Sequence, residues 1–335
     1  MKKFRRIFGA TLAVIMLAIS TSCNRCATGS EAASPSTTNF IKPTRIFSAD
    51  SAYAHIRAQI KFGPRVPGSE GSVACQQYII DALTADSAVV TVQRSEVKAY
   101  NGDRLPICNI LGSFNPASHN RILLLAHYDT RPWSDNESDP AKVAEPVPGA
   151  NDGASGVAVL LELARQFRIN PPENIGVDLL FVDAEDYGMS EGFATNDETW
   201  CLGTQYWVRH TPYTEENRPR YCIVLDMVGG INARFHREYY SDQIAPSIVD
   251  KVWSVAERSG FADRFVNSTG GNIIDCHVYV NRIGIPSIDI IESRNEDTRS
   301  FPPTWHRNSD NLHNIDKSSL NAVGQTMLNL IQLEK

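Results

Sequence analysis

The sequence lacks the clustered positive charge with which proteins bind nucleic acid or an anionic membrane surface. It has 32 Lys and Arg residues against 38 Asp and Glu, a formal net charge of −6. Four of the basic residues lie within the first 22 positions, so residues 23–335 carry 28 basic and 38 acidic side chains. This modestly acidic balance predicts no nucleic-acid partner and no membrane contact through charge.

Cysteine is also scarce, with seven residues in 335. The spacing of two cysteines separated by two residues occurs once, at Cys23 and Cys26 near the N-terminus, so a zinc site made of paired cysteine motifs is excluded. The other five cysteines stand singly, and we expect them to be buried as small apolar side chains. Their spacing fixes no disulfide pairing.

No apolar run is long enough for a comfortable membrane span. Basic MKKFRR precedes the apolar residues 7–19, which is the pattern of a signal peptide over residues 1–22. The following STSC resembles a bacterial lipoprotein cleavage site, where Cys23 would be lipidated, although Ser20 stands where leucine is usual. An ordinary signal peptide is the alternative. Either reading predicts export to the periplasm, and residues 23–47, rich in Ser, Thr, Ala and Pro, read as a flexible tether.

Helical and strand patterns alternate from residue 48 to the C-terminus without an internal repeat or a break in composition. This predicts one α/β domain over residues 48–335, with a central mixed, mostly parallel β-sheet flanked by helices. The expected strands are residues 89–92, 108–112, 121–126, 176–182, 221–227 and 283–291, and the expected helices are 53–62, 73–83, 154–167, 203–209, 248–260 and 315–333.

Imidazole and carboxylate groups follow the apolar strands. In open α/β sheets, sites form at the carboxyl ends of the strands, and this mixture of ligands suits zinc. Each signal alone has an ordinary explanation, such as a helix cap or a solvated acidic loop. Together they predict a zinc site, with one of two neighbouring acids free to act as general acid and base. The residues are His127, Asp129, Asp152, Glu185, Asp186, Asp226 and His306.

Two long polar loops join these positions, at residues 133–148 and 188–200. A loop of such length inside a compact domain is usually functional or disordered. Because residues 133–148 connect two of the proposed ligands, we expect that loop to be functional.

The order HYD, GANDGASG, DAED, LDM, WHRNSD resembles the zinc aminopeptidase superfamily with co-catalytic metals. Within it, the chain is most similar to the glutaminyl-peptide cyclotransferases of the animal type, from about Gly63 to the end. The segments NIIDCHVYVNRIGIP and SFPPTWHRNSDN carry this narrower resemblance. The leader suggests a bacterial member.

The resemblance implies a role for each matching residue. A single zinc would bind Asp152, Asp186 and His306, and Glu185 would be the catalytic acid and base. Asp226 and Asp275 would complete its hydrogen-bond network. His127, with Asp129 beside it, corresponds to the histidine that binds a second zinc in the peptidases. Trp305 and Phe301 would wall the substrate pocket, and Phe193, Trp200 and Trp133 are weaker candidates.

The implied activity is cyclisation of an N-terminal glutamine to pyroglutamate with loss of ammonia, on peptides or exported proteins. Two departures stand out: Asp186 occupies a position where glutamate is usual, and the cysteine pair of the animal enzymes beside HYD is absent. The alternative is a two-zinc aminopeptidase, since all its ligand types are present. A non-catalytic binding lipoprotein ranks third, and we expect a monomer.

Overall fold

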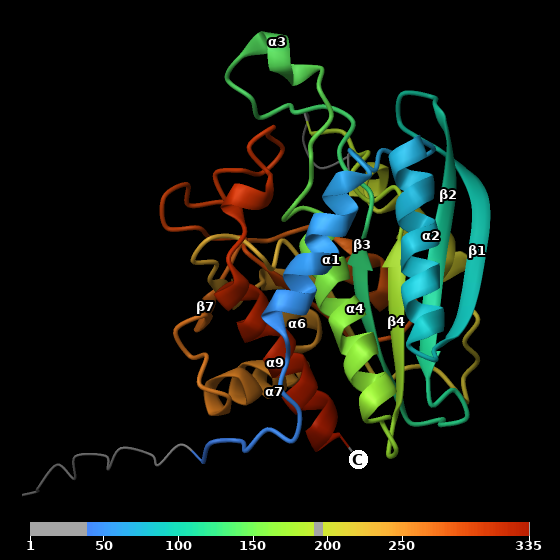
Figure 1. The fold of residues 1–335 in the computed structure, drawn as a ribbon, viewed down its shortest axis with the longest axis vertical. Coiled ribbons are helices and arrows are strands. Elements are labelled where there is room, and N and C mark those ends of the chain that lie inside the picture. The colour runs from blue at the N-terminus through green and yellow to red at the C-terminus, as the bar shows by residue number, and fades with distance from the viewer. Residues whose placement is uncertain (1–38, 191–196, 335) are drawn as a thin grey trace, which may run out of the picture. The chain divides into compact units, whose positions relative to one another are not determined.

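The computed structural model describes residues 39–190 and 197–334. A six-stranded sheet with the order β1-β2-β4-β3-β5-β8 forms the centre of the fold (Figure 1). Its strands are β1 (Val89–Lys98), β2 (Arg104–Phe114), β3 (Arg121–His127), β4 (Gly176–Val182), β5 (Cys222–Asp226) and β8 (Ser287–Ile291). Two further strands, β6 (Phe235–Arg237) and β7 (Phe265–Thr269), pair in parallel beside it.

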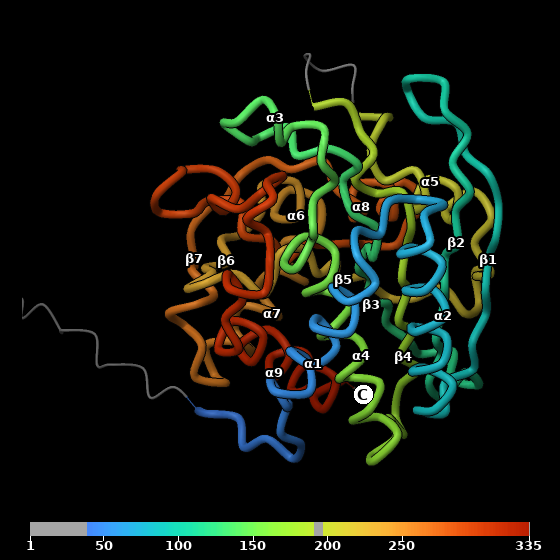
Figure 2. Tube along the Cα trace, turned by 45° about the horizontal axis from the view of Figure 1, so that its top comes forward, coloured from blue at the N-terminus to red at the C-terminus, as the bar shows by residue number. Residues whose placement is uncertain are grey.

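The sheet confirms the predicted mixed, mostly parallel architecture. Strands β1, β2 and β4 pair antiparallel, whereas β4, β3, β5 and β8 run parallel. The carboxyl ends of the parallel strands therefore meet at one edge, the end of the molecule where α3 lies in Figure 1. Figure 2 turns that end toward the viewer and shows the loop that carries α3 beside the loop after β8. A hydrogen bond joins the two loops: the backbone amide of Asn136 donates to the carbonyl of His306 at 3.2 Å.

Helices cover both faces of the sheet, because the central strands are apolar on both sides. Ile122 and Leu124 of β3 belong to a core shared with α4, while Leu123 and Leu125 face a second core. Helices α1, α2, α4, α7 and α9 contribute to the first core, and α5 and α8 to the second. Their bounds are α1 (Ala49–Lys61), α2 (Glu70–Ala85), α4 (Ala154–Ile169), α5 (Leu202–Arg209), α7 (Pro246–Arg258), α8 (Cys276–Asn281) and α9 (Lys317–Leu333).

All the predicted helices and strands are present, with bounds shifted by a few residues. Strands β1 and β2 are longer than expected because they form an extended antiparallel hairpin. The sequence patterns missed the shortest elements: the strands β6 and β7 and the helices α3 (Pro140–Val143), α6 (Tyr239–Ile244) and α8. Elements of three to six residues are too short to show a periodic pattern.

The folded domain begins before the predicted boundary at residue 48. Phe47 is buried, and its ring packs against Gly324 of α9. The backbone amide of Phe47 donates to Gln325 Oε1 at 2.9 Å. The amide of Thr44 donates to Gln332 Oε1 at 3.0 Å. Residues 39–47 of the predicted tether therefore pack on the domain; the predicted signal peptide and residues 23–38 lie outside the described residues.

Among residues 39–190 and 197–334, no helix combines the length and hydropathy needed to cross a membrane. The prediction of buried single cysteines is confirmed: Cys75, Cys108, Cys201, Cys222 and Cys276 are all buried free thiols.

Candidate active site and metal centre

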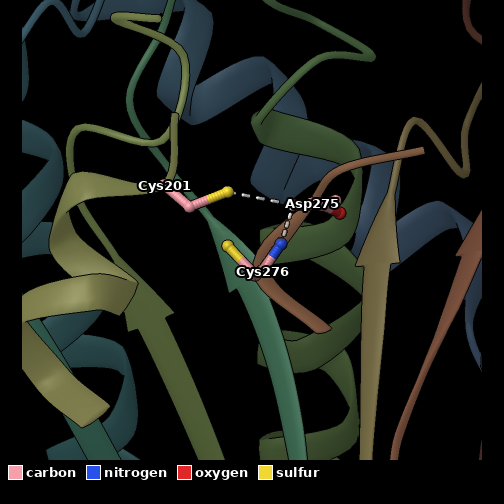
Figure 3. Close-up of side chains that lie close together, drawn as sticks. All are labelled: Cys201, Asp275 and Cys276. Carbon is pink, nitrogen blue, oxygen red and sulfur yellow. Dashed lines mark hydrogen bonds between the residues drawn. The ribbon is translucent and has the colours of Figure 1, made fainter. Parts of the chain in front are cut away.

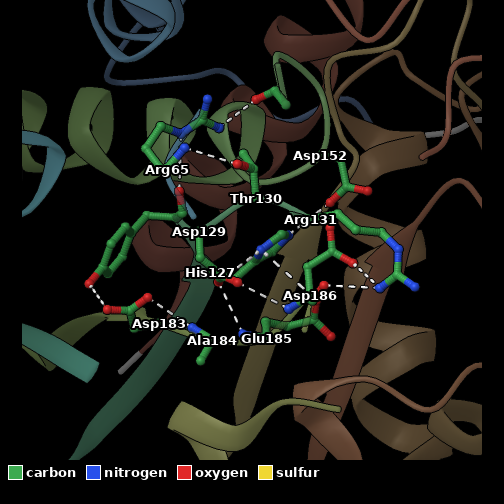
Figure 4. Close-up of polar contacts among 12 residues, drawn as sticks. Arg65, His127, Asp129, Thr130, Arg131, Asp152, Asp183, Ala184, Glu185 and Asp186 are labelled. Carbon is green, nitrogen blue, oxygen red and sulfur yellow. Dashed lines mark hydrogen bonds and ion pairs between the residues drawn. The ribbon is translucent and has the colours of Figure 1, made fainter. Parts of the chain in front are cut away.

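The carboxyl ends of β3, β4, β5 and the loop after β8 bring most of the predicted site residues together. Figure 4 shows His127, Asp129, Asp152, Glu185 and Asp186 among them. They border a cavity of about 300 Å³ that opens at this edge of the sheet. Its lining includes Asp152, Glu185, Asp186, Asp226, Asp275, Phe301, Trp305 and His306, with Trp200, Met227, Ile273 and Ile291 among the apolar residues. His127 and Asp129 are buried below its floor.

Asp152, Asp186 and His306 form one group able to hold a metal ion. One ligand atom from each lies within 4.8 Å of the others, and all three residues are buried. His306 Nε2 lies 3.1 Å from Asp186 Oδ1. Asp186 Oδ2 is buried without a hydrogen-bond partner, as expected for an oxygen that a cation would satisfy. The shorter side chain of Asp186 thus reaches the centre of the group.

His306 is oriented by a residue that the sequence did not single out. Its Nδ1 lies 3.0 Å from Asp135 Oδ1, an arrangement that turns Nε2 toward the metal group. Burial lowers the pKa of His306, but the carboxylates of Asp186 and Asp135 outweigh this and raise it to about 9. Asp135 belongs to the loop at residues 133–148, so that loop takes part in the site.

Asp152 is shared with a second group, formed with His127 and Asp226. His127 Nε2 lies 3.2 Å from Asp152 Oδ1 and 3.1 Å from Asp226 Oδ1. Burial raises the pKa of Asp226 to about 7, although the neighbouring His127 opposes the shift. The geometry therefore offers two adjacent cation positions that have one carboxylate in common.

Two buried aspartates hold the main chain beside the ligands. Both oxygens of Asp129 accept backbone N–H groups, from Glu185 at 3.0 Å and from Asp186 at 3.1 Å. Asp310 does the same for Asn151 at 2.8 Å and Asp152 at 3.0 Å. Asp129 also lies 3.5 Å from His127 Nδ1, without a hydrogen bond to it. We call the two pairs of backbone hydrogen bonds, one pair accepted by Asp129 and one by Asp310, the backbone grips.

Arg131 ties the loops on the ligand side together, and sequence patterns gave no sign of it beyond its place two residues after Asp129. Its side chain is fully buried. It donates to the carbonyls of Asp186 at 3.0 Å and Gly188 at 3.1 Å and pairs with Asp135 at 2.5 Å. Since a buried guanidinium needs an opposite charge, removing the carboxylate of Asp135 would leave its charge poorly compensated.

Glu185 lines the same cavity, beside Cys201 and Asp275. Cys201 Sγ is 3.1 Å from Glu185 Oε1 and 3.7 Å from Asp275 Oδ1. Burial raises the pKa of Glu185 well above its ordinary value; His127 opposes this, and the carboxylates of Asp275 and Asp186 add to it. A carboxyl group with a raised pKa is suited to both accepting and returning a proton.

Aromatic rings wall the cavity near the metal group. The Trp305 ring stacks on His306 with centroids 3.9 Å apart, and Phe301 packs on Trp305 at 4.3 Å. Trp200 also lines the cavity, whereas Trp133 does not: it packs on Tyr187 at 5.3 Å in a separate apolar cluster. Phe193, the remaining candidate, lies outside the described residues.

Residues 109–331 match the family model for peptidase family M28. The chain belongs to peptidase family M28. The M28 match covers every predicted ligand, and it confirms the resemblance to the zinc aminopeptidase superfamily that the sequence motifs indicated.

Solved structures of glutaminyl cyclases are similar to this M28 domain. That of Bacteroides thetaiotaomicron glutaminyl cyclase bound to N-acetylhistamine is 46% identical with a TM-score of 0.83, covering 87% of this chain and 99% of the other. That of Porphyromonas gingivalis glutaminyl cyclase is 41% identical with a TM-score of 0.81, covering 86% and 98%. Aminopeptidase YwaD of Bacillus subtilis is 28% identical over 81% of this chain, which spans only 54% of that relative's length.

Proposed function

We propose that this M28 protein is a glutaminyl-peptide cyclotransferase, which converts the N-terminal glutamine of a peptide or protein to pyroglutamate and releases ammonia. The observation that carries the proposal is the cavity itself: a small space lined by the metal group, by Glu185 and by Trp305. The similarity to solved glutaminyl cyclases over nearly their whole length supports it.

We infer that Asp152, Asp186 and His306 hold one zinc ion. Their mixed oxygen and nitrogen donors, their mutual spacing and the unpartnered oxygen of Asp186 fit this ion. When bound, zinc would polarise the side-chain amide carbonyl of the substrate glutamine as a Lewis acid.

Glu185 performs the proton transfers in this proposal. The neutral α-amine forms a bond to its own side-chain carbonyl carbon, and the bond from that carbon to the amide nitrogen breaks. The carboxylate of Glu185 takes the proton lost by the amine and returns it to the departing nitrogen, which leaves as ammonia. No water is consumed. Asp226 and Asp275 border the same part of the cavity, and the charge of Asp275 helps to keep the pKa of Glu185 raised.

The aromatic walls and the small volume select the substrate. Trp305 and Phe301 exclude water from the reacting groups and favour a compact side chain over a long or charged one. Holding the amine and the carbonyl close together lowers the entropic part of the barrier. A cavity of this size suits one terminal residue, with the rest of the peptide outside.

The second candidate function is a two-zinc aminopeptidase. The group formed by His127, Asp152 and Asp226 favours it, because it would provide a second metal position beside the first. Glu185 would then activate water instead of transferring a proton within the substrate.

One assay separates the two functions. The purified zinc-loaded protein is incubated with two peptides that differ only in the first residue, Gln or Leu, and their masses are followed. Cyclisation predicts loss of ammonia from the first and no change in the second. Release of a free amino acid from either peptide would overturn the cyclase proposal. Two tightly bound zinc ions per chain, found together with such release, would point to the aminopeptidase.

We also propose that the protein is exported to the periplasm, with residues 1–22 as its signal peptide and Cys23 as the anchor when lipidated. The basic start and short apolar run support this. Fractionation of cells producing the full chain or the Cys23→Ser variant tests it: the variant should move from the membrane to the soluble periplasmic fraction. Natural substrates would then be other exported proteins, with the enzyme acting as a monomer.

A further inference from the structure

Two cysteines and a carboxylate form a buried cluster behind the proton-transfer side of the cavity. Ligand atoms of Cys201, Asp275 and Cys276 all lie within 4.8 Å of one another, and the two sulfur atoms face the same small space in Figure 3. All three residues are buried, yet Asp275 also lines the cavity, so the cluster borders the space that substrates enter.

We propose that Cys201, Cys276 and Asp275 form a second metal site, specific for a soft thiophilic cation. Thiolates select soft ions such as zinc or copper(I) over calcium and magnesium. Asp275 Oδ1 lies 3.7 Å from Cys201 Sγ and accepts the backbone N–H of Cys276, so an oxygen ligand is present beside both thiols. Glu185 Oε1, at 3.1 Å from Cys201 Sγ, is positioned to serve as a fourth ligand.

The protein holds both thiols in place before any ion arrives. Cys201 has left-handed backbone angles, with φ of 54°, and its amide donates to the carbonyl of Glu185 at 2.9 Å. The hydroxyl of Thr204 donates to Cys276 Sγ at 2.9 Å, a contact that a thiolate would strengthen. Binding of a divalent cation releases both thiol protons to solvent and forms two metal–sulfur bonds.

Occupation of this site would inhibit the proposed reaction without displacing the metal held by Asp152, Asp186 and His306. The cation would draw Asp275 away from the cavity and neutralise charge beside Glu185, the proton-transfer residue. This consequence depends on the proposed function, but the binding itself does not.

Cadmium(II) is the probe, because cadmium–thiolate bonds absorb in the ultraviolet. Reduced protein carrying one equivalent of zinc per chain is titrated with cadmium chloride, and bound zinc and cadmium are counted after gel filtration. We expect one cadmium per chain with thiolate absorption while zinc is retained. Cys201→Ser and Cys276→Ser should each weaken cadmium binding by at least about tenfold, because each removes a direct ligand. Cys75→Ser, at another buried cysteine, should leave it unchanged.

Cadmium that replaces zinc without thiolate absorption would overturn the proposal, as would absorption that survives both substitutions. If the variants do not fold, X-ray absorption of cadmium bound to the wild-type protein decides: two sulfur neighbours support the site, and one or none contradicts it. Because neither readout requires turnover, a wrong cyclase assignment would leave the cadmium result unaffected.

Discussion

The proposed metal ligands and the proposed proton-transfer residue are held by different kinds of contact. On the ligand side, the backbone grips of Asp129 and Asp310 fix the main chain at residues 185–186 and 151–152. On the proton-transfer side, the Glu185 carboxyl accepts from the thiol of Cys201, which is a weak donor, and lies 4.0 Å from His127 Nδ1. The pKa of Glu185 is raised well above its ordinary value.

This difference separates carboxylates that stabilise the fold from a carboxyl group suited to proton transfer. Carboxylates that accept two backbone N–H groups stabilise the loops that carry the ligands. A buried carboxyl group with few donors is costly in its charged form, and it can therefore exchange a proton readily. Substitutions on the ligand side should impair metal binding, whereas substitutions on the proton-transfer side should impair turnover alone.

Glu185→Gln should have the largest effect. The substitution keeps the shape of the side chain but removes its ability to transfer a proton, so kcat should fall by about 10²–10⁴-fold or more. Zinc content and melting temperature should match the wild type, because the backbone N–H of residue 185 still donates to Asp129. Stopped assays with the Gln-initiated peptide and metal analysis provide the measurements; a variant that keeps its activity would remove Glu185 from the mechanism.

Asp310→Asn should have an intermediate effect, on the metal. The amide has one acceptor oxygen in place of two, so one of the backbone N–H groups at residues 151–152 loses its partner. Loss of such support typically weakens metal affinity by about 10–100-fold. Competition with a zinc chelator measures it. Asp316→Asn is the matched control, since Asp316 also accepts a backbone N–H, from Ser318 at 2.8 Å, but at the start of α9. Equal affinity in both variants would contradict the role of the grip.

We expect the smallest effect at two buried glutamates outside the cavity, Glu238 and Glu292. They allow the same comparison, between a carboxylate that accepts backbone N–H groups and one with few donors. Glu238 accepts backbone N–H groups from Tyr240, Ser241 and Ile273. Burial raises its pKa, but His277 and the N–H groups of Ile273 and Ser241 outweigh this and lower the pKa below its ordinary value. Glu292 has an unpartnered Oε2, and burial raises its pKa to about 7.

These opposite shifts predict opposite pH dependence. The carboxyl group of Glu292 loses its proton near pH 4.5 in the unfolded chain and near pH 7 in the folded protein. This residue therefore reduces the stability of the fold as pH rises through that window. Glu292→Gln should therefore be more stable than wild type by on the order of 2 kcal/mol at about pH 8, with no difference near pH 4. Glu238→Gln should be less stable at about pH 8, with the deficit disappearing as pH falls through the folded pKa. Urea unfolding across this range measures both, and shifts of the same sign would refute the distinction.

The sequence predicted the central sheet and the grouping of the candidate ligands because both depend on local patterns. Apolar strands such as residues 121–126 and 176–182 are buried on both faces; His127 follows the first directly, and Asp186 lies four residues after the end of the second. Asp135 and Cys201 were not predicted as site residues, because their partners lie far along the chain: Asp135 meets His306 from 171 positions away. Asp310 lies within the motif WHRNSD, but that it holds residues 151–152 follows from the tertiary structure alone.

The backbone grips do not depend on which side chains residues 185–186 and 151–152 carry. Asp129 and Asp310 hold residues 185–186 and 151–152 through peptide N–H groups, and every amino acid except proline supplies such a group. These hydrogen bonds would therefore persist if the side chain of Asp186, a proposed ligand, were exchanged; its Oδ1 also lies 3.5 Å from Arg131. Exchange of this one side chain is accordingly a way to alter the proposed metal preference while the backbone hydrogen bonds remain.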